Sequence, residues 1–110
     1  KYNEALADFN KLLEIDPDNE LALGKRGETY FMMGKYNEAL ADLSERLEKN
    51  QNIAFALRIR AGAYYKLHKY KEAIDDLTKS LAIEQKNVFA LSYRGSEFYK
   101  LKRFKNHSKI

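Results

Sequence analysis

ELALGKRGETYFMMGKYNEALADLSERLEKNQNI, residues 20–53, is followed directly by AFALRIRAGAYYKLHKYKEAIDDLTKSLAIEQKN, residues 54–87, and the two stretches share residue types at corresponding positions. A shift of 34 residues also aligns the flanking parts of the chain. The aligned columns are Tyr2, Tyr36, Tyr70 and Phe104; Ala5, Ala39 and Ala73; Asp8, Asp42 and Asp76; Leu13, Leu47 and Leu81; Leu23, Leu57 and Leu91; Arg26, Arg60 and Arg94; and Tyr30, Tyr64 and Phe98. Seven such columns at one period indicate a repeated structural unit.

Each unit contains apolar residues at helical spacing in two consecutive segments. Leu57, Ala61 and Tyr64 mark the first segment of one unit, and Ala73 and Leu77 mark the second. Turn-forming residues separate the segments, and the short linkers force neighbouring helices to be antiparallel. We therefore expect helices over residues 2–15, 20–33, 36–49, 54–67, 70–83 and 88–101.

Small residues recur where two helices of a pair must approach closely. They occupy one column on the first helix, with Gly27, Ala61 and Gly95, and one on the second helix, with Ala39 and Ala73. Leucine and tyrosine side chains then fill the contact between the helices. The sequence thus predicts helix pairs that nest against one another.

These columns resemble the tetratricopeptide repeat (TPR) family. The residues that match its pattern are Leu23, Arg26-Gly27, Tyr30, Ala39 and Leu43 in one repeat, and Leu57, Arg60-Ala61, Tyr64, Ala73 and Leu77 in the next. The chain departs from the pattern with leucine in place of the leading tryptophan, arginine before the small residue, and Gln51 and Gln85 at the terminal proline position. The resemblance implies an all-α fold, a right-handed α-α superhelix (solenoid) of antiparallel helix pairs.

On this reading, residues 1–110 form a single TPR array. Residues 1–19 supply the second helix of a repeat, 20–53 and 54–87 are full repeats, and 88–110 hold a first helix and a basic tail. We expect the tail to begin a further second helix at Lys102 and to fray at His107, where the pattern needs alanine. Because the chain begins within a repeat, we expect it to be part of a longer array.

Composition excludes several function classes. The chain has no cysteine and two histidines, His68 and His107, so we expect neither a metal site nor a cofactor. No catalytic constellation can be assembled, and Asp75 and Asp76 point about 100° apart on a helix, so we do not expect an enzyme. No signal peptide or membrane span is visible, which favours an intracellular, cytoplasmic protein without membrane contact.

Charge is distributed unevenly along the chain. Residues 1–50 carry 7 basic and 11 acidic side chains, whereas residues 51–110 carry 13 and 5. The arginine column, Arg26, Arg60 and Arg94, repeats with the aspartate column, so we interpret both as ion pairs between packed helices. Such pairs stabilise by about 0.2–1 kcal/mol at partly exposed sites.

One face of each first helix has no evident packing role. In the TPR family the first helices line a concave groove, and we expect the peptide-binding residues there. They are Leu21, Glu28, Phe31, Phe55, Arg58, Tyr65, Lys66, Phe89, Ser92, Tyr99 and Lys100. We expect Phe31, Tyr65 and Tyr99 to form an aromatic ladder, with an extended apolar peptide of some acidic character as guest. The alternative is that these aromatics pack between adjacent repeats.

The sequence therefore predicts a protein–protein interaction scaffold that binds a peptide segment of a partner. A nucleic-acid-binding helical repeat that uses the basic C-terminal half is one alternative, and an engineered or self-assembling repeat module is another. Head-to-tail self-association is a further expectation, because the acidic start of one copy can stack on the basic end of the next.

Overall fold

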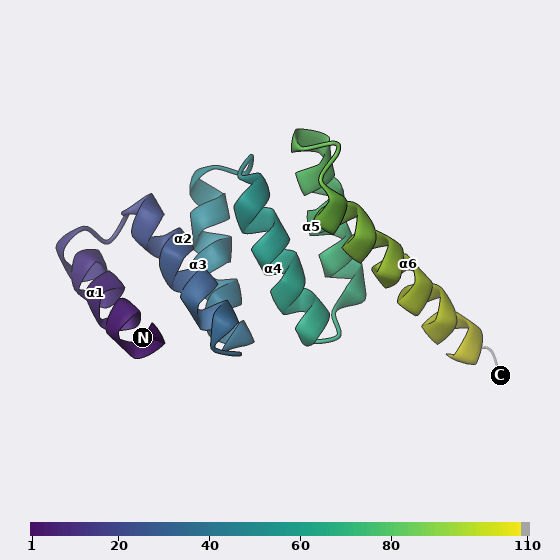
Figure 1. The fold of residues 1–110 in the computed structure, drawn as a ribbon, viewed down its shortest axis with the longest axis horizontal. Helices are drawn as coiled ribbons and strands as arrows, with labels where there is room; N and C mark the ends of the chain where they lie inside the picture. Colours follow the sequence, from purple (N-terminus) through teal and green to yellow (C-terminus); the bar gives the residue numbers. More distant parts are fainter. Residues whose placement is uncertain (109–110) are drawn as a thin grey trace.

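The computed structural model describes residues 1–108 of the chain, and the side chains of residues 1–103 (Figure 1). Its elements are six helices: α1 (Tyr2–Ile15), α2 (Glu20–Met32), α3 (Tyr36–Lys49), α4 (Ala54–Lys66), α5 (Tyr70–Ile83) and α6 (Val88–Ser108). The described residues contain no strand. The expected helices agree with these bounds to within one residue, except at the end of α6.

The helices form an elongated solenoid of antiparallel pairs, with extents of 53 × 27 × 22 Å. In Figure 1 α2 passes in front of α3, and α6 passes in front of α5. The first helices of the repeats, α2, α4 and α6, begin at Glu20, Ala54 and Val88. No helix of the described residues is long and apolar enough to cross a membrane.

The pairs nest at the small-residue columns. A methyl group built on Gly27 would lie 2.9 Å from Cγ of Leu43, so α2 and α3 meet there without room for a side chain. In the next repeat Ala61 is buried against α5. Buried side chains gather in two clusters, one of Ala39, Leu43, Leu47, Ala56 and Leu57, and one of Ala61, Ala73, Leu77, Leu81 and Ala90. The predicted nesting is confirmed at both pairs.

Left-handed residues make the turns within the pairs. Gly34 has φ 79° and His68 has φ 61°. After Gly34, the backbone amide of Lys35 donates to the carbonyl of Tyr30 at 2.8 Å. After His68, the amide of Lys69 donates to the carbonyl of Tyr64 at the same distance, and these hydrogen bonds close the ends of α2 and α4. Histidine is one of the few residues with a side chain that are enriched in this conformation.

The end of α6 corrects the predicted boundary. We expected this helix to stop at Leu101 and a second helix to begin at Lys102, but α6 continues to Ser108. Lys102 stands in the same column of the repeat as Gly34 and His68, 34 residues after His68. A lysine has no preference for positive φ, so the chain stays helical where the two earlier repeats turn. The side chain of His107 lies outside the described residues.

In the two full repeats the arginine and aspartate columns form bidentate ion pairs between the two helices. Nε of Arg26 lies 2.7 Å from Asp42, and Nε of Arg60 lies 2.7 Å from Asp76. The hydrogen bonds that Arg60 donates to Asp76 raise the pKa of the Arg60 guanidinium. In each pair the aspartate is buried and the arginine is partly exposed, so the carboxylate depends on its arginine more than in a pair at the surface.

Loss of one arginine should therefore destabilise the fold strongly. Arg60→Met leaves a buried carboxylate without its partner, and we expect the free energy of unfolding to fall by about 3 kcal/mol in denaturant titrations. Arg94→Met is the matched control. Arg94 occupies the same column but contacts the Thr78 hydroxyl, at 3.4 Å, so its loss should cost less than about 1 kcal/mol. Equal losses for the two variants would contradict this interpretation.

Candidate functional site

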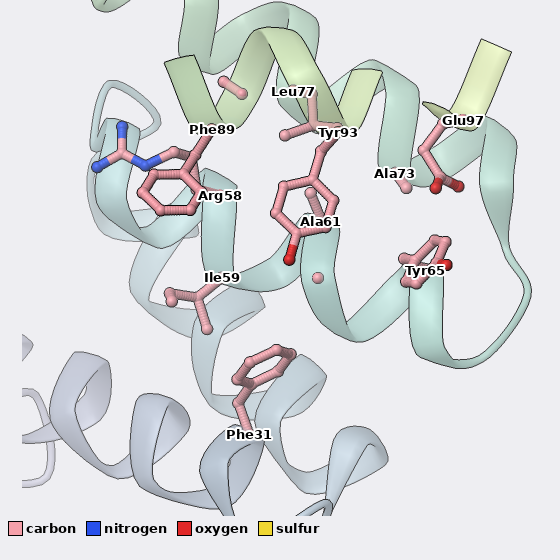
Figure 2. A pocket seen from close by; sticks show the side chains of 12 residues that line it. Phe31, Arg58, Ile59, Ala61, Tyr65, Ala73, Leu77, Phe89, Tyr93 and Glu97 are labelled. Carbon is pink, nitrogen blue, oxygen red and sulfur yellow. The ribbon is translucent and has the colours of Figure 1, made fainter. Parts of the chain in front are cut away.

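A pocket of about 190 Å³ opens between the last two repeats, where α4, α5 and α6 meet (Figure 2). Most of its lining is apolar or aromatic. The lining residues are Phe31, Arg58, Ile59, Ala61, Gly62, Tyr65, Ala73, Leu77, Phe89, Ala90, Tyr93 and Glu97. Most of the exposed lining comes from the first helices α4 and α6, with Phe31 added from α2.

Gly62 lets Phe31 reach this pocket from the preceding repeat. A methyl group on Gly62 would lie 3.0 Å from two carbons of the Phe31 ring, so the ring rests directly on the α4 backbone. The Phe31 ring also packs edge-on against Tyr36, with centroids 5.6 Å apart. Phe31 is thereby held in position at the edge of the pocket.

Tyr65 is fixed from several sides. Its ring lies 6.3 Å from that of Tyr93 and 6.1 Å from that of Tyr70. Nζ of Lys100 sits 3.8 Å from the ring centroid and donates a hydrogen bond to the Tyr65 hydroxyl. Phe31 and Tyr65 therefore pack between repeats, as the alternative interpretation expected, and line the pocket as well.

The two charged residues of the lining differ in their surroundings. Figure 2 shows Arg58 beside Phe89 on one side of the pocket and Glu97 near Tyr65 on the other, with Tyr93 between them. Arg58 forms an ion pair with Glu84 at the start of the α5–α6 linker. Its positive charge is therefore already balanced.

Glu97 is the unusual residue of the site. Its side chain is fully buried, and neither carboxylate oxygen has a hydrogen-bond partner among the described residues. Burial raises the pKa of Glu97, and the nearby positive charge of Lys100 opposes this shift. A buried carboxylate without a partner destabilises the fold, because its lost hydration is not replaced.

The predicted groove residues divide into those at the pocket and those away from it. Phe31, Arg58, Tyr65 and Phe89 line it, and Lys100 contacts Tyr65. Leu21 and Phe55 line a separate shallow depression near the start of α2 and α4. Of the remaining four, Glu28 lies 3.8 Å from Lys25, Lys66 lies 6.0 Å from the Tyr65 ring centroid, and Ser92 and Tyr99 are exposed.

The aromatic neighbour of Tyr65 on α6 is Tyr93, and Tyr99 lies outside the pocket with 67% of its surface exposed. Tyr65 is covered by Tyr70 of the following helix. An equivalent cover for Tyr99 would need a turn after Leu101, where α6 instead continues. Tyr65 therefore contacts the ring of Tyr93 on α6, and Tyr99 does not take the position that the expected ladder of Phe31, Tyr65 and Tyr99 gave it.

Sequence reasoning missed Ile59, Tyr93 and Glu97. Two features of the sequence indicate Tyr93 and Glu97. Phe89, Tyr93 and Glu97 follow one another at four-residue spacing, which places them on one stripe of a helix. Glu97 also interrupts a column in which the earlier repeats have Thr29 and Ala63.

A protein-family model described as anaphase-promoting complex, cyclosome, subunit 3 matches residues 1–80. The chain belongs to this family, which is of the tetratricopeptide type. No curated protein matches the sequence.

Solved structures of TPR domains have the same fold. The first TPR domain of Spaghetti (RPAP3), solved with the HSP90 peptide SRMEEVD bound, is 27% identical to this chain, with a TM-score of 0.89. The match covers 93% of this chain and 81% of the RPAP3 chain. MamA is 26% identical with a TM-score of 0.88, over 92% of this chain, which spans 59% of the MamA chain. The Sgt2 TPR domain from Aspergillus fumigatus is 19% identical to this chain, with a TM-score of 0.86. The match covers 96% of this chain and 71% of the Sgt2 chain, and at this identity it shows the fold alone.

Replacement of the buried carboxylate should stabilise the protein. We expect Glu97→Met, which keeps the length of the side chain, to raise the free energy of unfolding by about 1–3 kcal/mol at neutral pH. Because the folded state holds the proton of Glu97 more tightly than the unfolded state, the penalty grows as pH rises above the ordinary glutamate pKa of about 4.3. The difference between variant and parent should therefore shrink at acidic pH. Denaturant titrations at both pH values measure it, and a variant less stable than the parent at neutral pH would contradict the assignment.

Proposed function

We propose that this chain is a protein-interaction module that binds an extended segment of a partner protein across its first helices. The observation that carries the proposal is the aromatic pocket between α4 and α6. Phe89 at its rim has 74% of its surface exposed, although the lining around it is apolar. A surface of this kind is typical of sites that bind a side chain of another molecule.

The relatives support a peptide as the ligand. A structure 27% identical to this chain holds an HSP90 peptide. Stacked helix pairs expose an extended face built from their first helices, and such faces accept extended peptides. Some TPR domains use lysine, asparagine and arginine to clamp a terminal carboxylate, and that activity is not carried over, because the predicted groove residues include no asparagine.

The walls of the pocket suit a guest side chain that has apolar carbon atoms to bury. The aromatic walls suit aliphatic or aromatic side chains, whereas Arg58 is paired with Glu84 and is not free to attract an acidic guest. A nucleic acid would need unpaired cations at the site to neutralise its phosphates. The pocket therefore favours a peptide over the nucleic-acid alternative.

Two exposed aromatics on α6 test the proposal. Peptides selected by the chain from a random display library should bind Phe89→Ala at least about tenfold more weakly, since Phe89 lines the pocket. Tyr99→Ala is the matched control, because Tyr99 is similarly exposed but lies outside the pocket. Isothermal titration measures the affinities, and circular dichroism checks that both variants keep their helicity. Selection of no peptide, or equal effects of the two substitutions, would argue against this function.

We also propose that copies of the chain stack head to tail. Exposed apolar residues at both ends of the array favour this second proposal. Ile15 of α1 has 77% of its surface exposed, and Phe98 of α6 has 52%. We expect the average mass in light scattering to rise with protein concentration and to fall on addition of salt, because acidic and basic halves would meet. A constant monomer mass would remove this proposal and leave the peptide site unaffected.

A further inference from the structure

The carboxylate of Glu97 needs a partner that the described part of the chain does not supply. Buried charges in proteins are normally paired or hydrogen-bonded, and Asp42 and Asp76 of this chain follow the rule. Glu97 breaks it, with both oxygens unpartnered in the wall of a pocket. The position itself tolerates a small apolar residue, because Ala63 occupies it one repeat earlier and is fully buried.

The cations near the pocket are engaged elsewhere. Arg58 is paired with Glu84 on the far side of Tyr93, and Lys100 donates to the Tyr65 hydroxyl while its ammonium lies over the Tyr65 ring. Lys100 weakly favours the charged form of Glu97 but makes no ion pair with it within 4.0 Å. The carboxyl group of Glu97 is therefore left without a counter-charge among the described residues.

The dimensions of the pocket limit what that ligand is. Its volume of about 190 Å³ lies below the roughly 300–1,000 Å³ of pockets that enclose whole small molecules. A single amino-acid side chain suits this size. The aromatic rings of Tyr93 and Phe89 suit the aliphatic stem of a long side chain, and their faces attract a cationic head group.

We propose that the pocket takes a lysine or arginine side chain from the partner's segment, with Glu97 as its counter-charge. This inference rests on the proposed function and names the side chain that the peptide must carry. The stem lies against the aromatic walls, and the cationic group meets the carboxylate on the Tyr65 side of the pocket. Because Glu97 is fully buried in the free chain, the walls must move apart to admit the cation. Only this repeat carries the charge, since Thr29 and Ala63 stand at the equivalent positions. The basic residue of the segment therefore sets the register of the peptide along the array.

A selection experiment tests the inference. The chain, Glu97→Gln and Glu38→Gln each select binders from a random display library of short linear peptides. Glu38→Gln is the matched control, because Glu38 is exposed on α3 and its loss changes the net charge equally. We expect the parent and the control to enrich one lysine or arginine among apolar residues, and Glu97→Gln to select apolar peptides without that residue.

Affinities of one selected peptide make the test quantitative. Replacement of its basic residue by norleucine should weaken binding to the parent at least about tenfold and leave binding to Glu97→Gln within about twofold. Lys100→Met should bind the basic peptide more tightly than the parent, because a like charge near the site is removed.

Several outcomes would overturn the inference. If the parent selects apolar peptides without a basic preference, or if Glu97→Gln keeps that preference, the carboxylate does not receive the cation, although the proposed function stands. Weaker binding by Lys100→Met would show that Lys100 helps to hold the peptide and would contradict the assigned charge balance. Selection of no peptide at all would remove the inference together with the proposed function.

Discussion

The close approach of the two helices within each repeat is the constraint on which the rest of the structure depends. At Gly27 the backbone of α2 meets Leu43 with no space for a methyl group, and Ala61 plays the same role between α4 and α5. This contact commits one face of each first helix to its own pair. The opposite face then remains for neighbouring repeats and for a ligand, so the nesting of the pairs determines where the pocket forms.

Charged groups in the interior behave in two different ways. Arg60 satisfies both oxygens of Asp76, at 2.7 and 2.8 Å, and the pair ties two helices together. Glu97 is buried as fully as Asp76 yet has no partner among the described residues. Violations of such local rules concentrate at functional sites, where stability is lost in exchange for a ready binding group. The contrast within one chain separates a structural carboxylate from a candidate functional one.

The sequence predicted the helices, their pairing and the family, because these follow from a period that local residue types reveal. It did not predict the continuation of α6, which depends on whether Lys102 adopts the left-handed conformation seen at His68. It predicted four of the pocket residues, among them Phe31 and Tyr65, but missed Tyr93 and Glu97. The burial of Glu97 and the position of Tyr93 beside Tyr65 depend on how α6 lies against α4 and α5, and the periodicity of a single helix does not contain that information.

A direct measurement of where a peptide lies on the chain tests the account best. Intermolecular nuclear Overhauser effects between a selected peptide and the isotope-labelled chain locate the contact surface. The account predicts contacts to Phe89, Tyr93 and Ala61, on the pocket between α4 and α6. Contacts concentrated instead at Lys79 and Ile83, in the polar depression along α3 and α5, would contradict it.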